Sequence, residues 1–229
     1  NNLNSLTSLE FERADKTNNA VLSVAADTIT GLPLIETLTL SDRVKTIPTS
    51  FVTHCAILTT VNIPASVESI GTYVFYPYGF TAVVGARAIG PYMSNLTTVN
   101  IEDVDHPIYE GDEHGSPRKL TRLENSAFDR TPKLTTINLP DSITFIGTYA
   151  FRDSAIEHLI VPAGLGSIGG NTFARMPKLR TVSFAGYQTA IGSNAFTGCA
   201  SLETVVFPPS VKTLNGGTFS GCTALKTVA

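Results

Sequence analysis

Several groups of residues have types and spacings that could support chemistry, and a glycine-rich run is the first of them. Gly164-Leu-Gly166-Ser-Ile-Gly169 spells the G-x-G-x-x-G fingerprint of dinucleotide binding. That fingerprint requires a helix directly after it and an acid about 20 residues further on. Positions 185–190 hold no acid, and Gly169 also fills a position where glycine recurs along the chain. The sequence therefore predicts no nucleotide cofactor.

The cysteines and histidines offer thiol, disulfide or metal chemistry. Cys222 follows Cys199 at an interval that recurs along the chain, and Cys55 stands alone. On neighbouring coils of a stack, the first two would lie within disulfide range by Cα distance, and the alternative is a pair of small buried thiols. His54 and His158 have no second ligand nearby in sequence, whereas a metal site needs several converging ligands. No Ser–His–acid set can be assembled, because geometry defines a triad, so we predict no catalytic residues and no enzyme.

Acidic residues crowd one stretch between Ile101 and Leu120. The stretch contains Glu102, Asp103, Asp105, Glu110, Asp112 and Glu113, together with His106 and His114. Oxygen ligands at this density could hold Ca²⁺, although their spacing matches no EF-hand loop. Dense charge is more often a solvated surface. Both explanations stay open, and no metal ligand is assigned.

Composition limits the possible classes of function. The chain has 229 residues, of which 42% are hydrophobic and 15% charged, so it is ordered rather than disordered. Sixteen basic and nineteen acidic residues give a net charge of −3, which offers no footprint for nucleic acid or an anionic membrane. No run approaches the roughly 18 apolar residues that span a bilayer. The segment from Asn1 lacks the basic and apolar regions of a signal peptide.

A repeated pattern, Leu-x-x-Val-x-Ile, determines the architecture. One copy reads Leu58-Thr-Thr-Val61-Asn-Ile63-Pro64. The copies start at Leu6, Ile35, Leu58, Leu96, Leu134, Ile156, Leu179, Leu202 and Leu225, so that the start-to-start steps are 29, 23, 38, 38, 22, 23, 23 and 23. Alternate apolar residues predict a short strand with one buried face, and the proline after it ends the strand. Because one coil cannot bury its own apolar edge, we expect the coils to stack with their strands in one parallel sheet.

Each copy has a second half with an aliphatic pair, usually a glycine, and then an aromatic residue. Ile143, Ile146, Gly147 and Phe151 are an example. We expect the phenylalanines to form a column inside the wall opposite the sheet, each contributing roughly 1.5–3 kcal/mol by burial. The glycines indicate either positive φ or close packing between coils, and Pro48 at this position cannot take positive φ.

The run Ile191-Gly-Ser-Asn-Ala195-Phe196-Thr-Gly-Cys199-Ala-Ser-Leu202 resembles the BspA-like leucine-rich repeats, whose pattern is L-x-x-I-x-I-P-x-x-V-x-x-I-G-x-x-A-F-x-x-C. Residues Leu214 to Leu225 nearly repeat it, and the resemblance covers almost the whole chain. It implies a right-handed solenoid on bacterial cell-surface or secreted proteins that are implicated in adhesion to host proteins and other cells. The family has no catalytic residues to transfer, and its repeats leave the partner open.

We therefore expect one leucine-rich-repeat solenoid domain over residues 1–229. It should be mainly β, a right-handed curved stack of about nine coils of roughly 23 residues. The parallel sheet should form the concave face, with turns or 3₁₀ pieces on the convex side. The chain stops within a repeat, at Leu225-Lys-Thr-Val228-Ala229. Since repeat arrays need a polar cap, we expect the native protein to continue or this edge to pair with a second copy.

Two 38-residue steps each carry 15 residues more than a 23-residue coil (38 − 23), at about 76–92 and 102–118. Both insertions flank the strand Leu96–Ile101, and insertions in repeat proteins are surface loops that often bind partners. The aromatic insertion either packs on its own coil or is exposed. We predict partner contact through Tyr76, Tyr78, Phe80 and Tyr92 as anchors, Asp103, Asp105, Asp112 and Glu113 as attraction for a basic surface, and Thr97, Thr98 and Asn100 on the strand between.

The predicted function is protein binding or adhesion at a bacterial surface, or as a secreted protein, through the concave sheet and the two insertions. The partner would be a host extracellular protein or another cell-surface protein. Two other classes stay open. One is a rigid structural spacer that holds another domain away from the membrane. The other is a glycan-binding module in which the aromatic residues of the first insertion stack on sugars.

Overall fold

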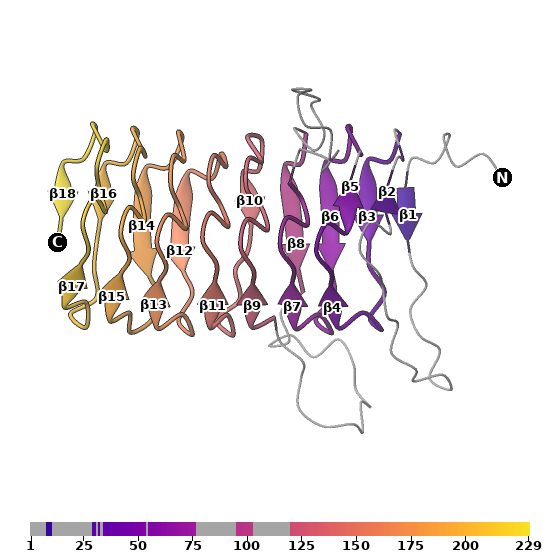
Figure 1. The fold of residues 1–229 in the computed structure, drawn as a ribbon, viewed down its shortest axis with the longest axis horizontal. Coiled ribbons are helices and arrows are strands. Elements are labelled where there is room, and N and C mark those ends of the chain that lie inside the picture. Colours follow the sequence, from indigo (N-terminus) through magenta and orange to yellow (C-terminus); the bar gives the residue numbers. More distant parts are fainter. Residues whose placement is uncertain are drawn as a thin grey trace, which may run out of the picture.

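Short parallel strands, stacked coil upon coil in a single row, make up the molecule (Figure 1). The computed structural model describes residues 8–10, 29–30, 32, 34–53, 55–76, 95–102 and 120–229. In these residues there is no α-helix and no 3₁₀ helix, and turns join the strands. The expected leucine-rich-repeat solenoid is confirmed. The number of nine coils stays a prediction, because parts of the first coils lie outside the described residues.

The main strands arise from the Leu-x-x-Val-x-Ile pattern. The first sheet contains, in order, β1 (Ser8–Glu10), β3 (Thr37–Thr39), β6 (Thr60–Ile63), β8 (Thr98–Ile101) and β10 (Thr136–Ile137). The second contains β12 (His158–Val161), β14 (Thr181–Phe184), β16 (Thr204–Val205) and β18 (Thr227–Val228). All pairs are parallel, and equivalent repeat positions are partners, as Val61 and Val99 are. Residues that recur in the sequence therefore become neighbours in space.

A second set of two-residue strands runs along the lower edge of Figure 1. One sheet contains β4 (Thr46–Ile47), β7 (Ser69–Ile70), β9 (Arg122–Leu123) and β11 (Phe145–Ile146), and another contains β13 (Ser167–Ile168), β15 (Ala190–Ile191) and β17 (Thr213–Leu214). A separate pair joins β2 (Ile29–Thr30) and β5 (Val52–Thr53). The sequence predicts turns here but not these strands, because two residues are too few for an alternating pattern to show.

The predicted phenylalanine column is confirmed. Five fully buried rings, those of Phe75, Phe128, Phe151, Phe173 and Phe196, stack in sequence order. Neighbouring ring centroids lie 5.1 to 5.7 Å apart, and the rings are within 13° of parallel. Ring centroids at such distances are typical of attractive aromatic pairs. The column is therefore a continuous apolar support behind the sheets.

Close packing between coils, and not positive φ, explains the recurring glycines at Gly71, Gly147 and Gly192. A Cβ at Gly147 would lie 2.6 Å from the Asn125 nitrogen, and one at Gly192 would lie 2.6 Å from the Gly169 carbonyl carbon. Neither glycine has a positive φ. Positive φ instead occurs two residues later in each coil, at Ser50, Tyr73, Ser126, Tyr149, Asn171, Asn194 and Gly217.

Both rows of strands are interrupted at the same place, between β10 and β12 and between β11 and β13. The expectation of one continuous main sheet is therefore wrong. The coil that starts at Leu134 is one residue short, and the missing residue falls in the turn after Phe151. The rings of Phe151 and Phe173 still stack at 5.7 Å. The shortened turn thus keeps the phenylalanine column continuous, whereas the strands on either side of it no longer pair.

Candidate functional site

The outward face of β8 carries three of the predicted contact residues. Val99 and Ile101 point into the core, and the alternation of a strand places Thr98 and Asn100 on the opposite side. Thr97 precedes them at the start of the strand and is half-buried. The structure therefore places Thr98 and Asn100 on one outward surface, and Thr97 beside them lines the adjoining depression.

Neighbouring strands extend this surface with the same residue types. The threonine–asparagine face contains Thr59, Thr60 and Asn62, then Thr97, Thr98 and Asn100, then Thr135, Thr136 and Asn138. The Thr97 hydroxyl donates to the Thr59 carbonyl at 3.1 Å, and the Asn100 amide donates to the Asn62 side-chain oxygen at 2.8 Å. Hydrogen bonds from coil to coil hold these side chains in fixed positions. The face is consequently polar, uncharged and ordered in advance of any partner.

Asn138 takes a special place in this face. Its side-chain nitrogen donates to the Ile101 carbonyl at 2.7 Å, and its side-chain oxygen accepts from the Ile101 N–H at 3.0 Å. An amide group presents a donor and an acceptor, as a backbone peptide does. The Asn138 side chain thus makes the two hydrogen bonds to Ile101 that a backbone peptide group would make if β10, which has only two residues in the sheet, were longer.

A shallow depression with a volume of about 460 Å³ lies beside the threonine–asparagine face. Its lining residues are Glu36, Ile57, Thr59, Asn95, Thr97 and Lys133. Lys133 donates to the Asn95 side-chain oxygen at 2.6 Å, and Asn95 donates to the Ala56 carbonyl at 2.8 Å. The depression joins an acid from one coil and a lysine three main strands away, with threonines between. Only Thr97 of this lining was predicted from the sequence.

The other predicted contact residues are placed as follows. Tyr78, Phe80, Tyr92, Asp103, Asp105, Asp112 and Glu113 lie outside the described residues. Tyr76 is half-buried in the turn after Phe75, where its ring meets the Tyr73 ring edge to face at 5.1 Å. The Arg130 guanidinium lies 5.8 Å from the Tyr76 ring centroid. Tyr76 therefore packs against its own coil and a neighbouring arginine, which favours the packed alternative for the start of the aromatic insertion.

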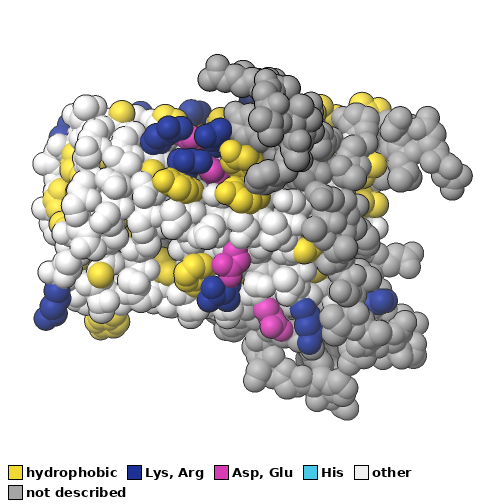
Figure 2. All heavy atoms as spheres, viewed as in Figure 1, with side chains coloured by type: hydrophobic (Ala, Val, Ile, Leu, Met, Phe, Trp, Pro, Cys, Tyr) yellow, Lys and Arg dark blue, Asp and Glu magenta, His cyan; other side chains and the backbone are white. Residues whose placement is uncertain are grey.

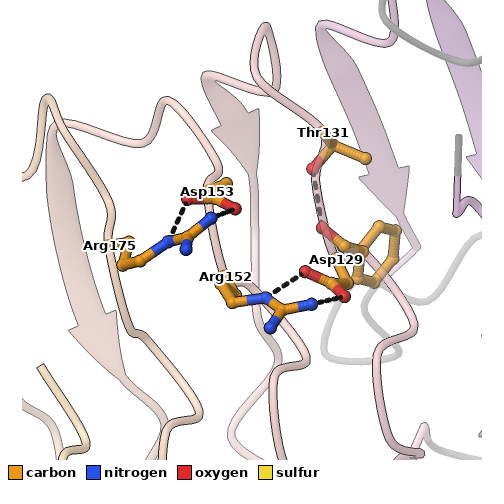
Figure 3. A network of polar contacts seen from close by, with 6 residues as sticks. Asp129, Thr131, Arg152, Asp153 and Arg175 are labelled. Carbon is orange, nitrogen blue, oxygen red and sulfur yellow. Dashed lines mark hydrogen bonds and ion pairs between the residues drawn. The ribbon is translucent and has the colours of Figure 1, made fainter. Parts of the chain in front are cut away.

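A second polar cluster lies in the turns after the phenylalanines (Figure 3). Arg152 donates to the Asp129 carboxylate through Nε at 2.8 Å and Nη2 at 2.5 Å, and Arg175 bonds Asp153 in the same two-pronged way. Burial raises the pKa of Asp129, although the bond from Arg152 opposes that rise. Bidentate bonds between adjacent coils make this cluster a structural tie. Its sequence signal is that Asp129 and Arg152 stand one repeat length apart.

The second main sheet presents a different chemistry on its outward side. Glu203 bonds Arg180 at 3.1 Å on one side and Lys226 at 3.0 Å on the other. The bond from Lys226 lowers the pKa of Glu203. His158 is exposed, and its Nδ1 lies 2.8 Å from the Thr181 hydroxyl oxygen. On the face drawn in Figure 2, charged side chains are few and gather in small groups of mixed sign.

Cys199 and Cys222 are not joined by a disulfide in the structure. Cys199 is fully buried, and its Sγ donates to the Phe173 carbonyl at 3.2 Å. Burial raises the pKa of Cys199 to about 12, and burial also raises the pKa of the half-buried Cys222. A thiol with so high a pKa supplies little thiolate for nucleophilic or metal chemistry.

Other candidate chemistry can be tested against the described residues. Gly169 follows directly on β13 and begins no helix in this stretch, so the dinucleotide fingerprint lacks its required context. In the part of the chain that the structure describes, no three His, Cys, Asp or Glu side chains are grouped to hold a metal ion. His54 and the acidic stretch after Glu102 lie outside that part, so the Ca²⁺ alternative stays a prediction. No helix among the described residues is long and apolar enough to cross a membrane.

Comparison with known proteins identifies the repeat. The sequence matches the family described as BspA type leucine rich repeat region, in six copies over residues 2–84 and 113–226. The chain therefore belongs to the BspA-type leucine-rich-repeat family. No curated protein matches it.

Solved structures of bacterial leucine-rich-repeat proteins are similar. A protein from Bacteroides ovatus ATCC 8483 shares 19% identity with a TM-score of 0.65, over 97% of this chain and 49% of its own. This likeness shows the fold, and the chain spans about half the length of that protein. The T. pallidum leucine rich repeat protein shares 24% identity, over 73% of this chain and 78% of its own, with a TM-score of 0.45. A leucine rich cell surface protein from Faecalibacterium prausnitzii A2-165 shares 19% identity, over 84% of this chain and 72% of its own, with a TM-score of 0.28.

Proposed function

We propose that this chain is a protein-binding module that serves adhesion at a bacterial surface or in a secreted protein. The threonine–asparagine face of β6, β8 and β10 would be its contact surface. The observation that carries this proposal is the coil-to-coil hydrogen bonding of that face, in which Asn100 bonds Asn62 at 2.8 Å and Thr97 bonds Thr59 at 3.1 Å. Side chains already held in place lose little entropy when a partner binds.

The depression beside this face supports a protein partner over a small molecule. It is open and shallow, whereas sites for small molecules are usually concave and mostly apolar. Glu36 and Lys133 at its borders would meet a cation and an anion of the partner, and the threonines between them would exchange hydrogen bonds. Membership of a repeat family whose coils act as interaction scaffolds supports the same function. The residues of both insertions would add contacts at the two ends of β8.

The test measures adhesion of the whole chain to immobilised extracellular-matrix proteins and to host cells. Thr60→Lys and Thr98→Lys place a long charged side chain on the proposed surface without touching the core. We expect each to lower binding by about tenfold or more, because an unmatched charge at an interface costs over about 1.4 kcal/mol.

Thr144→Lys is the matched control, since Thr144 is exposed on the other row of strands and bonds only the Thr121 carbonyl through its hydroxyl. This variant should bind as the parent does. Equal binding by all three variants, with unchanged circular dichroism, would place the contact surface elsewhere and overturn the proposal.

A further inference from the structure

The interruption between β10 and β12 leaves two neighbouring strands that do not pair with each other. We define the seam as residues 135–139 of one coil and 157–161 of the next. Within 120–229, which the structure describes without a gap, no backbone hydrogen bond joins these two segments. Figure 1 shows β10 and β12 farther apart than the paired neighbours on either side.

The alternation of a parallel sheet identifies the groups concerned. Residues of a strand direct their N–H and C=O alternately to one neighbour and to the other. Thr136 of β10 pairs with β8, so the next residue, Ile137, faces the seam, and the same alternation continued past the end of β10 places Leu139 on that side. Thr181 bonds the Glu157 carbonyl from the other side, so His158 and Ile160 of β12 also face the seam. Each of these four residues offers a backbone donor and a backbone acceptor toward the seam.

Apolar side chains are uncovered at the same place. Ile160 is 64% exposed on the outward side of β12. Ile137 is half-buried, whereas the equivalent Val99 of β8 and Val182 of β14 are at most 1% exposed. Leu139 is half-buried as well. The seam thus combines two strand edges that do not pair with each other and accessible aliphatic side chains. Among the described main strands from β6 to β18, no other junction between neighbours lacks its pairing.

The seam is held at both ends. The Ala155 N–H donates to the Leu134 carbonyl at 3.0 Å, and the Gly164 N–H donates to the Asp141 carbonyl at 2.8 Å. The Ala163 N–H also donates to the Asp141 carboxylate at 2.7 Å. These bonds keep the two coils together and limit the unpaired stretch to 135–139 on one side and 157–161 on the other.

We propose that the seam binds a short extended peptide segment of a partner protein by strand addition. Backbone N–H and C=O groups of the segment would pair with Ile137 and Leu139 on one edge and His158 and Ile160 on the other. Side chains on one face of the segment would cover Ile160 on the outward side, and those on the other face would cover Ile137 and Leu139 on the inward side. Strand addition draws its affinity from main-chain bonds and its selectivity from alternate side chains, which is what this site offers. The site is separate from the threonine–asparagine face, so either proposal can fail alone.

The test uses the probe peptide acetyl-Lys-Thr-Val-Thr-Val-Thr-Lys-amide and the whole chain. Calorimetry should give a dissociation constant on the order of 0.1 mM, and the Ile160 and His158 amides should exchange at least about tenfold more slowly with peptide bound. The same peptide with alternate amides N-methylated lacks donors on one edge and should bind at least about tenfold more weakly.

A protein variant closes the seam. One lysine inserted between Ser154 and Ala155 restores the spacing found from Phe128 to Leu134 and from Phe173 to Leu179. It should allow β10 and β12 to pair, slow the exchange of the Ile160 amide without peptide, and abolish peptide binding. Ser183→Ala, on the outward side of the fully paired β14, is the control and should bind as the parent does.

Three results would overturn the proposal. The first is that the parent chain does not bind the peptide at about 1 mM, a concentration that corresponds to a binding free energy of about 4 kcal/mol. The second is equal binding by the parent and the insertion variant. The third is slow exchange of the Ile160 and His158 amides in the free chain, which would mean that another segment of the same chain already fills the seam. If the insertion variant does not fold, the test rests on two measurements with the parent chain. These are its binding of the N-methylated and the unmethylated peptide, and the exchange rates of the Ile160 and His158 amides.

Discussion

Removing one ring from the phenylalanine column is the sharpest test of how this fold is stabilised. Phe173 is fully buried, and its ring centroid lies 5.7 Å from that of Phe151 and 5.5 Å from that of Phe196. Truncating a buried phenylalanine to alanine costs about 3–5 kcal/mol in transfer free energy and cavity formation. The two stacked contacts contribute about 0.5–1.5 kcal/mol each beyond buried area, which places Phe173→Ala in the upper part of that range.

Two matched variants calibrate this value. Phe219 ends the described column, is half-buried, and has the Phe196 ring at 5.8 Å, so Phe219→Ala should cost less than Phe173→Ala. Thr136 is exposed on the outward side of β10, and Thr136→Ala should cost under about 0.5 kcal/mol. The free energy of unfolding is measured by urea denaturation with circular dichroism, together with the m-value, because repeat arrays can unfold in parts. Equal midpoints for Phe173→Ala and Thr136→Ala would show that the column does not stabilise the stack.

Four further predictions concern other parts of the structure. Arg152→Gln should lower the free energy of unfolding by about 3–5 kcal/mol, because it leaves the buried Asp129 carboxylate without its cation. Arg175→Gln, at a side chain that is 58% exposed, should lower it by under about 1 kcal/mol, and urea or thermal unfolding of the two variants checks the difference. Because burial raises the folded-state pKa of Asp129, stability should fall as pH rises from the usual aspartate pKa through the raised value; Asp129→Asn should remove this slope, and carboxyl NMR should find Asp129 above and Glu203 below their usual values. Gly192→Ala should destabilise the chain strongly, since its Cβ would lie 2.6 Å from backbone of the preceding coil, while Gly216→Ala, with nothing within 4 Å, should be nearly neutral; equal melting temperatures would contradict the packing explanation. At pH 8 the native Cys199 thiol, with its pKa raised to about 12, should resist alkylation while unfolded protein reacts fully, and mass spectrometry that finds fast native modification would refute its burial.

Most of the fold could be predicted from the sequence because a solenoid repeats local rules. The apolar pattern of Leu58 to Ile63 occurs in nine copies, and most of the inward residues that it predicts, such as Val61, are buried where the structure describes them. The phenylalanine column follows from the same periodicity. What could not be predicted depends on three-dimensional detail. Positive φ at Tyr149 and Asp153 occurs in residue types that do not demand it, so no local signal marked these turns.

The interrupted sheet and the candidate site show the same limit. The 22-residue step beside steps of 23 is visible in the sequence. Only the structure shows that β10 and β12 do not pair where this residue is missing. The threonine–asparagine face follows from alternation, whereas the depression joins Glu36 and Lys133 from different coils across both long steps of the repeat. Residues of the two insertions have no repeat to fix their positions, so sequence alone could name them as candidates but could not place them.

The shortened coil also has a mechanical consequence. When a chain of stacked coils is pulled at its two ends, the load passes from coil to coil through backbone hydrogen bonds and stacked side chains. The junction between the coils that start at Leu134 and Ile156 lacks both rows of strand pairing and retains the Phe151–Phe173 contact, the Asp153–Arg175 ion pair and a few turn bonds. Under tension this junction is expected to part first, and to yield two shorter stacks that each keep their own sheets, so that the molecule would lengthen in a defined step before either stack unravels.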